Sequence, residues 1–155
     1  MLFRSTLPTI ATVSNFKFYT NPDLITNPGS VETIIQHLDG IDFKSFDLWN
    51  AHATGTPVGD KVEYELFNQT INRDIPLIGY KSYAGHCMAG AGAIEISMML
   101  DDYANNILRP NQILGEPIVN DDRIITEPTS FTYRKILKAG LGFGGKTVVC
   151  EIHLQ

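Results

Sequence analysis

Clustered and alternating apolar residues predict five strands along this chain. Residues 8–19 are rich in β-branched and aromatic side chains with partial alternation, which indicates one long strand. Short apolar segments at 46–49 and 75–78 predict two more strands. In the last third, residues 133–140 and 146–154 predict two strands joined by a glycine-rich turn. The chain is therefore expected to form a sheet whose last two strands are a hairpin.

Three helices are predicted between those strands. Ser30 has the place of an N-cap before apolar residues at helical spacing, and Gly40 ends that helix. A second helix is predicted over residues 61–67 and a third over residues 87–103. Strands and helices that alternate in this way predict an α/β fold with a mixed sheet, and we expect a single domain over residues 1–155.

The third predicted helix has an unusual composition. From Cys87 to Leu100 it is apolar on nearly every side, which is typical of a buried helix. Residues 89–93 are alternating alanines and glycines, although a glycine inside a helix costs about 1 kcal/mol relative to alanine. Residues this small are useful where another backbone approaches closely. Because one sheet can cover only one side of this helix, an unpartnered chain would expose an apolar patch, and we expect a partner there.

Composition and charge exclude several classes of protein. Hydrophobic residues at 43% and charged residues at 19% fit a globular protein. The net charge of -5 argues against a nucleic-acid binder, and Arg134, Lys135 and Lys138 are expected on a solvated face. Cys87 and Cys150 lack the spacing of a disulfide framework or zinc knuckle. With no secretory signal visible and no apolar run long enough to span a membrane, we expect a cytoplasmic protein.

Three predicted loops carry the residues that could perform chemistry. The first spans residues 50–60 between a strand and the next helix, and Pro57 is expected to end the strand. The second follows the strand at 75–78, and the third joins the last two strands. Because the first two loops follow short strands, both can open on one edge of the sheet, where open α/β sheets bind ligands. The candidate residues are His52, Thr54, Thr56, Lys81, His86 and Phe143.

The two histidines suggest a site for a carbonyl group. Neutral imidazoles of His52 and His86 could donate hydrogen bonds to a carbonyl oxygen that gains negative charge, and a glycine loop could add N–H donors. A single histidine after a strand is more often structural, but two in similar loops favour a functional site. The glycines at 140–145 do not fit a dinucleotide fingerprint, because no helix follows. No metal is expected, since His52, His86, Cys87 and His153 lack ligand spacing and carboxylate support.

Three motifs in a fixed order are the most specific signal in the sequence. They are Asn-Ala-His-x-Thr-x-Thr-Pro-x-Gly-Asp over residues 50–60, Lys-Ser-x-x-Gly-His with the small residues over 81–93, and Gly-Phe-Gly-Gly over 142–145. Together they resemble the C-terminal half of β-ketoacyl-acyl-carrier-protein synthases, the condensing enzymes of fatty-acid and polyketide synthesis. The resemblance covers nearly the whole chain. It implies one half of a thiolase-like fold, with a mixed sheet packed on a buried central helix.

The resemblance also implies a role for each motif. His52 and His86 would bind the malonyl thioester carbonyl, promote decarboxylation and stabilise the enolate. Lys81 would supply the positive charge that sets the electrostatic potential of the site, and it would pair with Glu63. Phe143 would lend a backbone N–H to the oxyanion hole and gate the acyl pocket. No bound cofactor is implied, because the phosphopantetheine of the acyl carrier protein is the substrate arm. The implied substrate-binding residues are Thr54, Thr56, Gly142 and Gly144, and Asp60 is a supporting residue.

The sequence departs from this family in its nucleophile. The family's reactive cysteine belongs to the N-terminal half, which is absent here, and neither Cys87 nor Cys150 replaces it. Without a thiolate, no acyl-enzyme forms by the family's route. We therefore expect two partners, an acyl carrier protein and either a Cys-bearing N-terminal condensing half or a second copy of this chain. A third possibility is that the chain is a piece of a longer protein that contains the N-terminal half. The remaining alternatives are a non-catalytic subunit similar to a chain-length factor and a homodimer that binds acyl or pantetheine groups.

Overall fold

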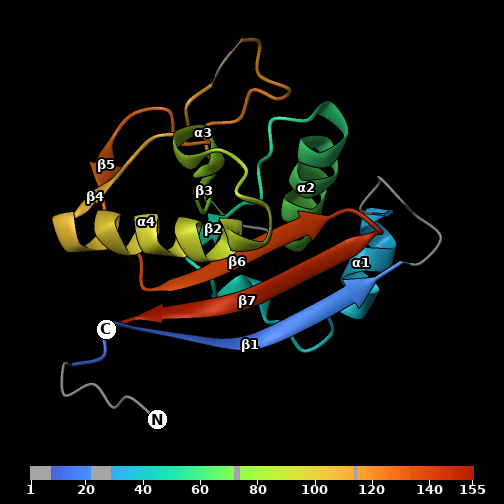
Figure 1. The fold of residues 1–155 in the computed structure, drawn as a ribbon, viewed down its shortest axis with the longest axis horizontal. Coiled ribbons are helices and arrows are strands. Elements are labelled where there is room, and N and C mark those ends of the chain that lie inside the picture. The colour runs from blue at the N-terminus through green and yellow to red at the C-terminus, as the bar shows by residue number, and fades with distance from the viewer. Residues whose placement is uncertain (1–7, 22–28, 72–73, 114) are drawn as a thin grey trace.

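A mixed sheet with helices on both faces forms the frame of the molecule (Figure 1). The computed structural model describes residues 8–21, 29–71, 74–113 and 115–155. The described strands are β1 (Ala11–Thr20), β2 (Leu48–Asn50), β3 (Leu77–Ile78), β4 (Ile107–Leu108), β5 (Thr129–Ser130), β6 (Lys135–Gly142) and β7 (Lys146–Leu154). The described α-helices are α1 (Val31–His37), α2 (Pro57–Thr70), α3 (Lys81–Ala84) and α4 (Ala91–Asn105), and short 3-10 helices span Phe43–Ser45 and Met88–Gly90.

The main sheet has the strand order β1-β7-β6-β2-β3. Its first half is antiparallel, since β7 pairs with β1 on one side and with β6 on the other. Its second half is parallel, since β2 lies between β6 and β3 in the same direction as both. The predicted mixed sheet and its C-terminal hairpin are therefore confirmed. The last strand has the predicted bounds, and the long N-terminal strand begins at Ala11, three residues later than predicted.

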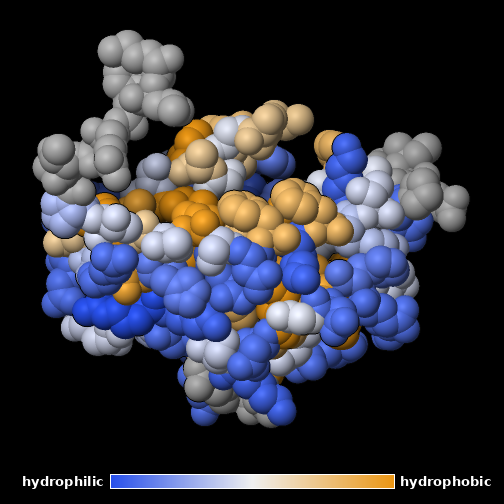
Figure 2. Space-filling model, turned by 90° about the horizontal axis from the view of Figure 1, so that it is seen from below, coloured by the Kyte–Doolittle hydropathy of each residue, from blue (hydrophilic) through white to orange (hydrophobic). Residues whose placement is uncertain are grey.

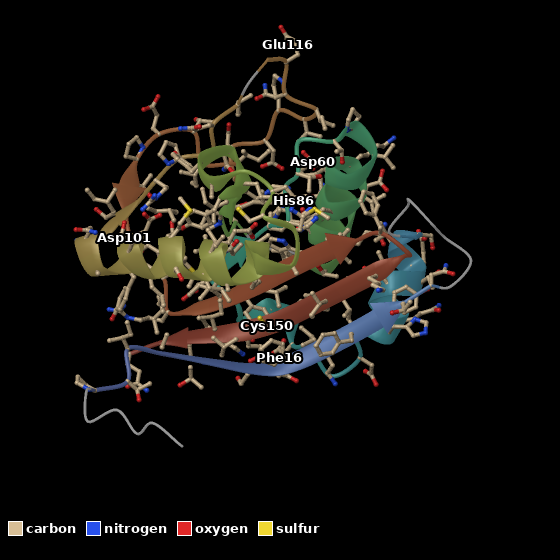
Figure 3. All side chains as sticks on the ribbon, viewed as in Figure 1. Phe16, Asp60, His86, Asp101, Glu116 and Cys150 are labelled. Carbon is tan, nitrogen blue, oxygen red and sulfur yellow. The ribbon has the colours of Figure 1, made fainter. Side chains whose placement is uncertain are left out.

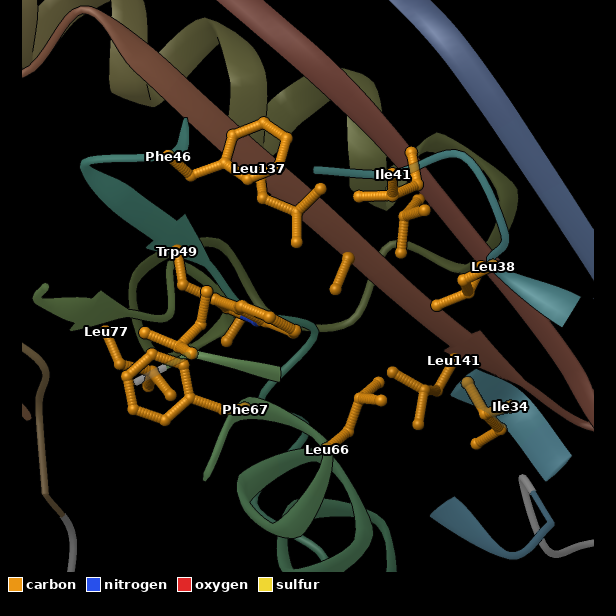
Figure 4. Close-up of a cluster of buried hydrophobic side chains, with 14 of the residues drawn as sticks. Ile34, Leu38, Ile41, Phe46, Trp49, Leu66, Phe67, Leu77, Leu137 and Leu141 are labelled. Atoms are coloured by element: carbon orange, nitrogen blue, oxygen red, sulfur yellow. The ribbon is translucent and has the colours of Figure 1, made fainter. Parts of the chain in front are cut away.

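One face of the sheet is closed by α1 and α2. The buried side chains of these helices pack on strand residues to form the larger hydrophobic cluster (Figure 4). Trp49 of β2 is completely buried and meets Phe67 of α2 edge to face, with 5.4 Å between ring centroids. Ser30 accepts a hydrogen bond from the backbone N–H of Thr33, which confirms the predicted N-cap of α1. This side of the sheet is therefore closed by a buried hydrophobic core.

The other face of the sheet is covered by α4. Met99 of α4 packs on Leu48, Ile136 and Ile152 of the sheet, and these residues form a second cluster. Neighbouring residues of β6 divide between the two faces, because successive side chains of a strand point to opposite sides. Ile136 belongs to the cluster under α4, and Leu137 belongs to the cluster under α1 and α2. The described sheet therefore lies between two helical layers.

The outward face of α4 is exposed in this chain. Gly92, Ala93, Ile94 and Ser97 are all solvent-accessible, whereas Met99 is fully buried. The expectation that one sheet covers only one side of this helix is thus confirmed. At the β1 edge of the sheet, apolar surface is also open to solvent, and Figure 2 shows it across the middle of that view. The large exposed apolar side chains there include Phe16 and Phe18.

Two helices begin at a different residue from the one predicted, and both end two or three residues later. The second helix begins at Pro57, not at residue 61, because proline is well suited to the first helical position, where no N–H partner is needed. Pro57 therefore starts a helix, and the predicted loop 50–60 ends at Thr56. The third helix begins at Ala91 and not at Cys87. Before it, Met88 has a φ of 49°, which interrupts the α-helix and leaves a 3-10 turn.

Several short elements were not predicted. They are α3, the 3-10 helices, and the two-stranded sheet formed by β4 and β5. Each spans four residues or fewer, which is too short to show a hydrophobic period. Among the described helices, none combines the length and apolar composition that crossing a membrane requires.

Candidate functional site

The two histidines lie together at one edge of the sheet. His52 follows β2 and His86 follows α3, which itself follows β3. Since β2 and β3 are parallel neighbours, their following loops open on the same side, as predicted. The imidazole rings of His52 and His86 are 5.4 Å apart between centroids and stand edge to face. Figure 3 labels His86 in the segment that leads from α3 to α4.

A buried carboxylate of α2 holds the His52 loop by its backbone. Glu63 is 3% exposed, and its two oxygens accept the N–H groups of His52 at 2.6 Å and Ala53 at 2.8 Å. Burial raises the pKa of Glu63, while these two hydrogen bonds act against that rise. The predicted pairing of Glu63 with Lys81 is wrong. The oxygens of Glu63 accept N–H groups of the His52 loop, and Lys81 pairs instead with Glu95 of α4.

Two buried lysines share one buried glutamate behind the histidines. Lys81 pairs with Oε1 of Glu95 and donates a hydrogen bond to the carbonyl of His52 at 2.5 Å. On the other side, Nζ of Lys138 lies 2.5 Å from Oε2 of Glu95. Lys138 also donates to the carbonyls of Ala51 at 3.0 Å and Ala139 at 2.7 Å. The prediction that Lys138 lies on a solvated face is therefore wrong, because it is only 6% exposed.

This arrangement keeps His52 uncharged at neutral pH. Burial is the largest cause, followed by the positive charges of Lys81 and Lys138 and by His86, and together they lower the pKa of His52 to about 3. Burial also lowers the pKa of Lys138, although Glu95 opposes that shift. A neutral imidazole carries one N–H and can donate one hydrogen bond. His52 is thus suited to bind an oxygen atom that gains negative charge, as the sequence suggested.

The first motif is folded around Asp60. Its carboxylate accepts the N–H of Gly55 at 3.2 and 3.1 Å, and Gly55 has the positive φ of 77° that favours glycine. The hydroxyls of Thr54 and Thr56 lie 3.0 Å apart. Burial raises the pKa of Asp60, which is half-buried. Asp60 therefore shapes the loop that presents both threonines to the site.

The loops of the two histidines are in direct contact. Gly79, after β3, packs so tightly against the first loop that a Cβ at this position would lie 2.5 Å from the Cβ of Ala53. Its N–H donates to the side-chain oxygen of Asn111 at 2.7 Å. Ala53 has a φ of 40°, so the loop turns sharply at this contact. The spacing between the two loops therefore depends on the absence of a side chain at position 79.

A cavity of about 1130 Å³ brings the predicted residues together. It lies between α4, the sheet and the loops, and its walls include Cys150 of β7 and the exposed aromatic residues of β1. Phe143 is 72% exposed at the turn between β6 and β7, where Gly144 has a φ of 76°. Glu63, Asp60 and Gly144 do not line the cavity. The predicted residues that line it are His52, Thr54, Thr56, Lys81, His86, Gly142 and Phe143.

Two site residues were missed by the sequence reasoning, Glu95 and Lys138. A signal was present in both cases. Glu95 is the single charge between Cys87 and Leu100 of an apolar helix, and Lys138 interrupts the apolar residues of a predicted strand. Charged residues are seldom fully buried unless they are paired, so two such interruptions suggest a pair. Within the described residues, no three His, Cys, Asp or Glu side chains converge as metal ligands would.

Comparisons with known proteins show which family the sequence resembles. A family model described as "Beta-ketoacyl synthase, C-terminal domain" matches residues 17–113. The 3-oxoacyl-acyl-carrier-protein synthase 2 of Mycobacterium leprae is 31% identical over 115 residues, which cover 72% of this chain and 27% of that protein. The polyketide biosynthesis malonyl-ACP decarboxylase PksF of Bacillus subtilis is 29% identical over 114 residues, covering 72% of this chain and 28% of that protein. The chain thus spans about a quarter of these relatives.

The fold is shared with solved ketosynthases. A β-ketoacyl synthase from Burkholderia phymatum superimposes with a TM-score of 0.80 at 22% sequence identity, over 94% of this chain and 38% of that one. The described chain therefore has the architecture of one half of a thiolase-like fold, as predicted. In that half, α4 is the helix with the small-residue face.

Proposed function

Because this chain belongs to the family of β-ketoacyl synthase C-terminal domains, we propose that it supplies the His-His-Lys part of a condensing site. The reaction is the decarboxylative Claisen condensation of malonyl-acyl carrier protein with an acyl thioester. The malonyl group loses carbon dioxide, and the resulting enolate carbon attacks the acyl carbonyl and displaces a cysteine thiolate. The observation that carries the proposal is the pair of imidazoles, 5.4 Å apart, on a cavity that also contains Lys81.

Each residue has a defined task in this proposal. His52 and His86 hydrogen-bond to the thioester oxygen of the malonyl group, where negative charge develops as the carboxylate leaves. The low pKa of His52 supports this role, because a neutral imidazole donates a hydrogen bond without giving up its proton. Lys81 donates a hydrogen bond to the carbonyl of His52 and neutralises the charge of Glu95. Phe143 and Gly142 line the acyl side of the cavity, and Thr54 and Thr56 line the path of the phosphopantetheine arm.

The thiolate comes from a Cys-bearing N-terminal half, whether as a separate chain or as another part of a longer one. That half docks on the outward face of α4, where Gly92 and Ala93 let a second helix approach closely. An added Cβ on Gly92 meets nothing within 4 Å, so the surface is open to a neighbour. Neither described cysteine supports an internal nucleophile. Cys87 is exposed and donates to the carbonyl of Ala84, and burial raises the pKa of Cys150.

The test is reconstitution. The chain is mixed with a Cys-bearing N-terminal half of a β-ketoacyl synthase, and condensation of acyl and malonyl carrier-protein thioesters is measured. We expect a rate well above that of the half alone, and at least a hundredfold loss for His52→Ala or His86→Ala, in line with removal of an oxyanion-stabilising donor. His37→Ala is the matched control, since His37 lies exposed on α1. No rate above the half alone would refute the proposal.

A second candidate function is decarboxylation without condensation. It is favoured by the similarity to a malonyl-ACP decarboxylase and by the presence of both histidines without a thiolate in this chain. Release of carbon dioxide and acetyl-acyl carrier protein from malonyl-acyl carrier protein measures it directly. If both histidine variants leave the activity of the complex unchanged, the chain is instead a non-catalytic subunit, similar to a chain-length factor.

A further inference from the structure

Glu95 faces two ammonium groups, although one would balance its charge. Its side chain is 2% exposed, and those of Lys81 and Lys138 are 4% and 7% exposed. Glu63, a further buried carboxylate, attracts Lys138 electrostatically, but its oxygens accept the backbone N–H groups of the His52 loop. A second buried ammonium is unfavourable unless it has a task, because its transfer from water is costly. The function proposed above assigns no task to Lys138.

The contacts of Lys138 point to the His52 loop. Its Nζ donates to the carbonyl of Ala51, while Nζ of Lys81 donates to the next carbonyl, that of His52. On the opposite side of the loop, Glu63 accepts the N–H groups of His52 and Ala53. The two lysines therefore hold the loop by its carbonyls, and Glu63 holds it by its N–H groups. Lys138 also brings a positive charge from β6 to a place that β2, α3 and α4 already enclose.

We propose that Lys138 is a positioning residue of the condensing site, which holds the His52 loop through Ala51 and keeps the imidazole of His52 uncharged. This inference rests on the proposed function for its biological meaning, but its geometry is independent of it. A like charge near an imidazole disfavours the protonated form. A merely structural Lys138 would anchor β6 to α4 and would leave the titration of His52 unchanged.

Several titratable groups besides Lys138 surround the imidazole of His52. Each element packed near the imidazole contributes at least one titratable group. They are Glu63 from α2, Lys81 from α3, His86 from the segment after α3, Glu95 from α4, Lys138 from β6 and Cys150 from β7. Lys138 lines the cavity as well, but the proposed reaction assigns it no task, so its charge can be removed without removing a group that has one. It is therefore the best position at which to test the role of the charge.

The experiment follows the ionisation of His52 in the full chain by NMR of its imidazole nitrogens, with the signal assigned from His52→Gln. In the unchanged chain we expect no protonation of His52 between pH 5 and pH 8. In Lys138→Met, which has a similar length and no charge, we expect the pKa of His52 to rise by about one unit or more. Lys138→Arg keeps the charge and should restore the original behaviour. Lys61→Met is the matched control, because Lys61 is exposed on α2.

Several outcomes would overturn the proposal. One is a His52 that titrates near its ordinary value of about 6.5 in the unchanged chain. Another is a folded Lys138→Met chain in which the titration of His52 is unchanged. Lys138→Gln is the second variant, because its amide can still donate to the carbonyl of Ala51 without carrying a charge. If circular dichroism shows that both uncharged variants unfold, the role of Lys138 is structural and the proposal is wrong.

A kinetic measurement separates this proposal from the proposed function. In the reconstituted complex, Lys138→Met should lower kcat more than it raises KM for malonyl-acyl carrier protein, because the His52 loop loses its hydrogen bond at the carbonyl of Ala51. If the unchanged chain shows no condensation with any Cys-bearing half, the proposed function fails. The NMR titration of the chain alone would still test the effect of Lys138 on His52, because it needs no partner half.

Discussion

The two faces of the sheet differ in how completely they are covered. Under α1 and α2, large side chains such as Trp49 and Phe67 fill the space and are fully buried. Under α4, packed residues such as Met99 give way to a cavity of about 1130 Å³ that extends to Phe18 on β1. The closed face carries the larger hydrophobic cluster, and the open face carries the histidines and both buried lysines. The contrast indicates that one face stabilises the fold, whereas the other leaves room for the site proposed above.

The strongest test of this contrast is a pair of aromatic truncations. Trp49→Ala removes a fully buried ring from the closed face, and we expect the free energy of unfolding to fall by about 3–5 kcal/mol. Phe18→Ala removes a ring that is 73% exposed on the open face, and we expect a change within about 0.5 kcal/mol. Urea denaturation followed by circular dichroism measures both. Equal losses would mean that the two faces contribute alike, and the contrast would be wrong.

A second pair compares two neighbours on α4. Asp102 is buried and accepts hydrogen bonds from Tyr80 at 2.9 Å and from the side chain of Arg109 at 2.5 Å. Asp102→Ala leaves that buried hydroxyl without its acceptor and removes one of the two carboxylates that pair with the guanidinium, and we expect a loss of about 2–3 kcal/mol in unfolding free energy. Asp101 also pairs with Arg109 but is 64% exposed, so Asp101→Ala should cost less than about 1 kcal/mol. Thermal unfolding measures both variants, and equal midpoint temperatures for Asp102→Ala and Asp101→Ala would contradict this prediction.

The pH dependence of stability reports on the open face. The folded state lowers the pKa of His52 to about 3, whereas an unfolded histidine has a pKa of about 6.5. Between these values the unfolded chain binds more protons, so stability falls as the pH is lowered from about 6.5 towards 3. One proton contributes at most about 1.4 kcal/mol per pH unit. We expect His52→Gln to have a shallower stability curve over this range; parallel curves for the two proteins would refute the lowered pKa.

The smallest effect tests the outward face of α4. Gly92→Ala adds a methyl group that meets nothing within 4 Å in this chain, and alanine favours a helix by up to about 1 kcal/mol over glycine. We expect the isolated chain to become slightly more stable. Assembly with a Cys-bearing half, followed by sedimentation, should become weaker, because the added methyl occupies the space of the approaching helix. Unchanged assembly would argue against docking at this face.

Element types and the site histidines could be predicted from local sequence, because they depend on spacing along the chain. Strand 146–154 is rich in β-branched and apolar residues, and His52 and His86 follow short strands within recognisable motifs. The partner of Lys81 could not be predicted in this way. Choosing Glu95 over Glu63 depends on how α4 and α2 pack against the sheet, and both carboxylates are plausible in sequence. The start of α2 at Pro57 was missed because proline both ends strands and begins helices.

The contact between Gly79 and Ala53 has a consequence for anyone who wishes to change this site. With 2.5 Å between the Cβ of Ala53 and the Cβ that any other residue would place at position 79, the two loops cannot be altered one at a time. A larger residue at position 79 would push His52 away from Glu63 and shift Lys81, which lies two positions further on. A transplant of this chemistry to a related protein would therefore have to carry residues 50–56 and 79–86 together, as one piece.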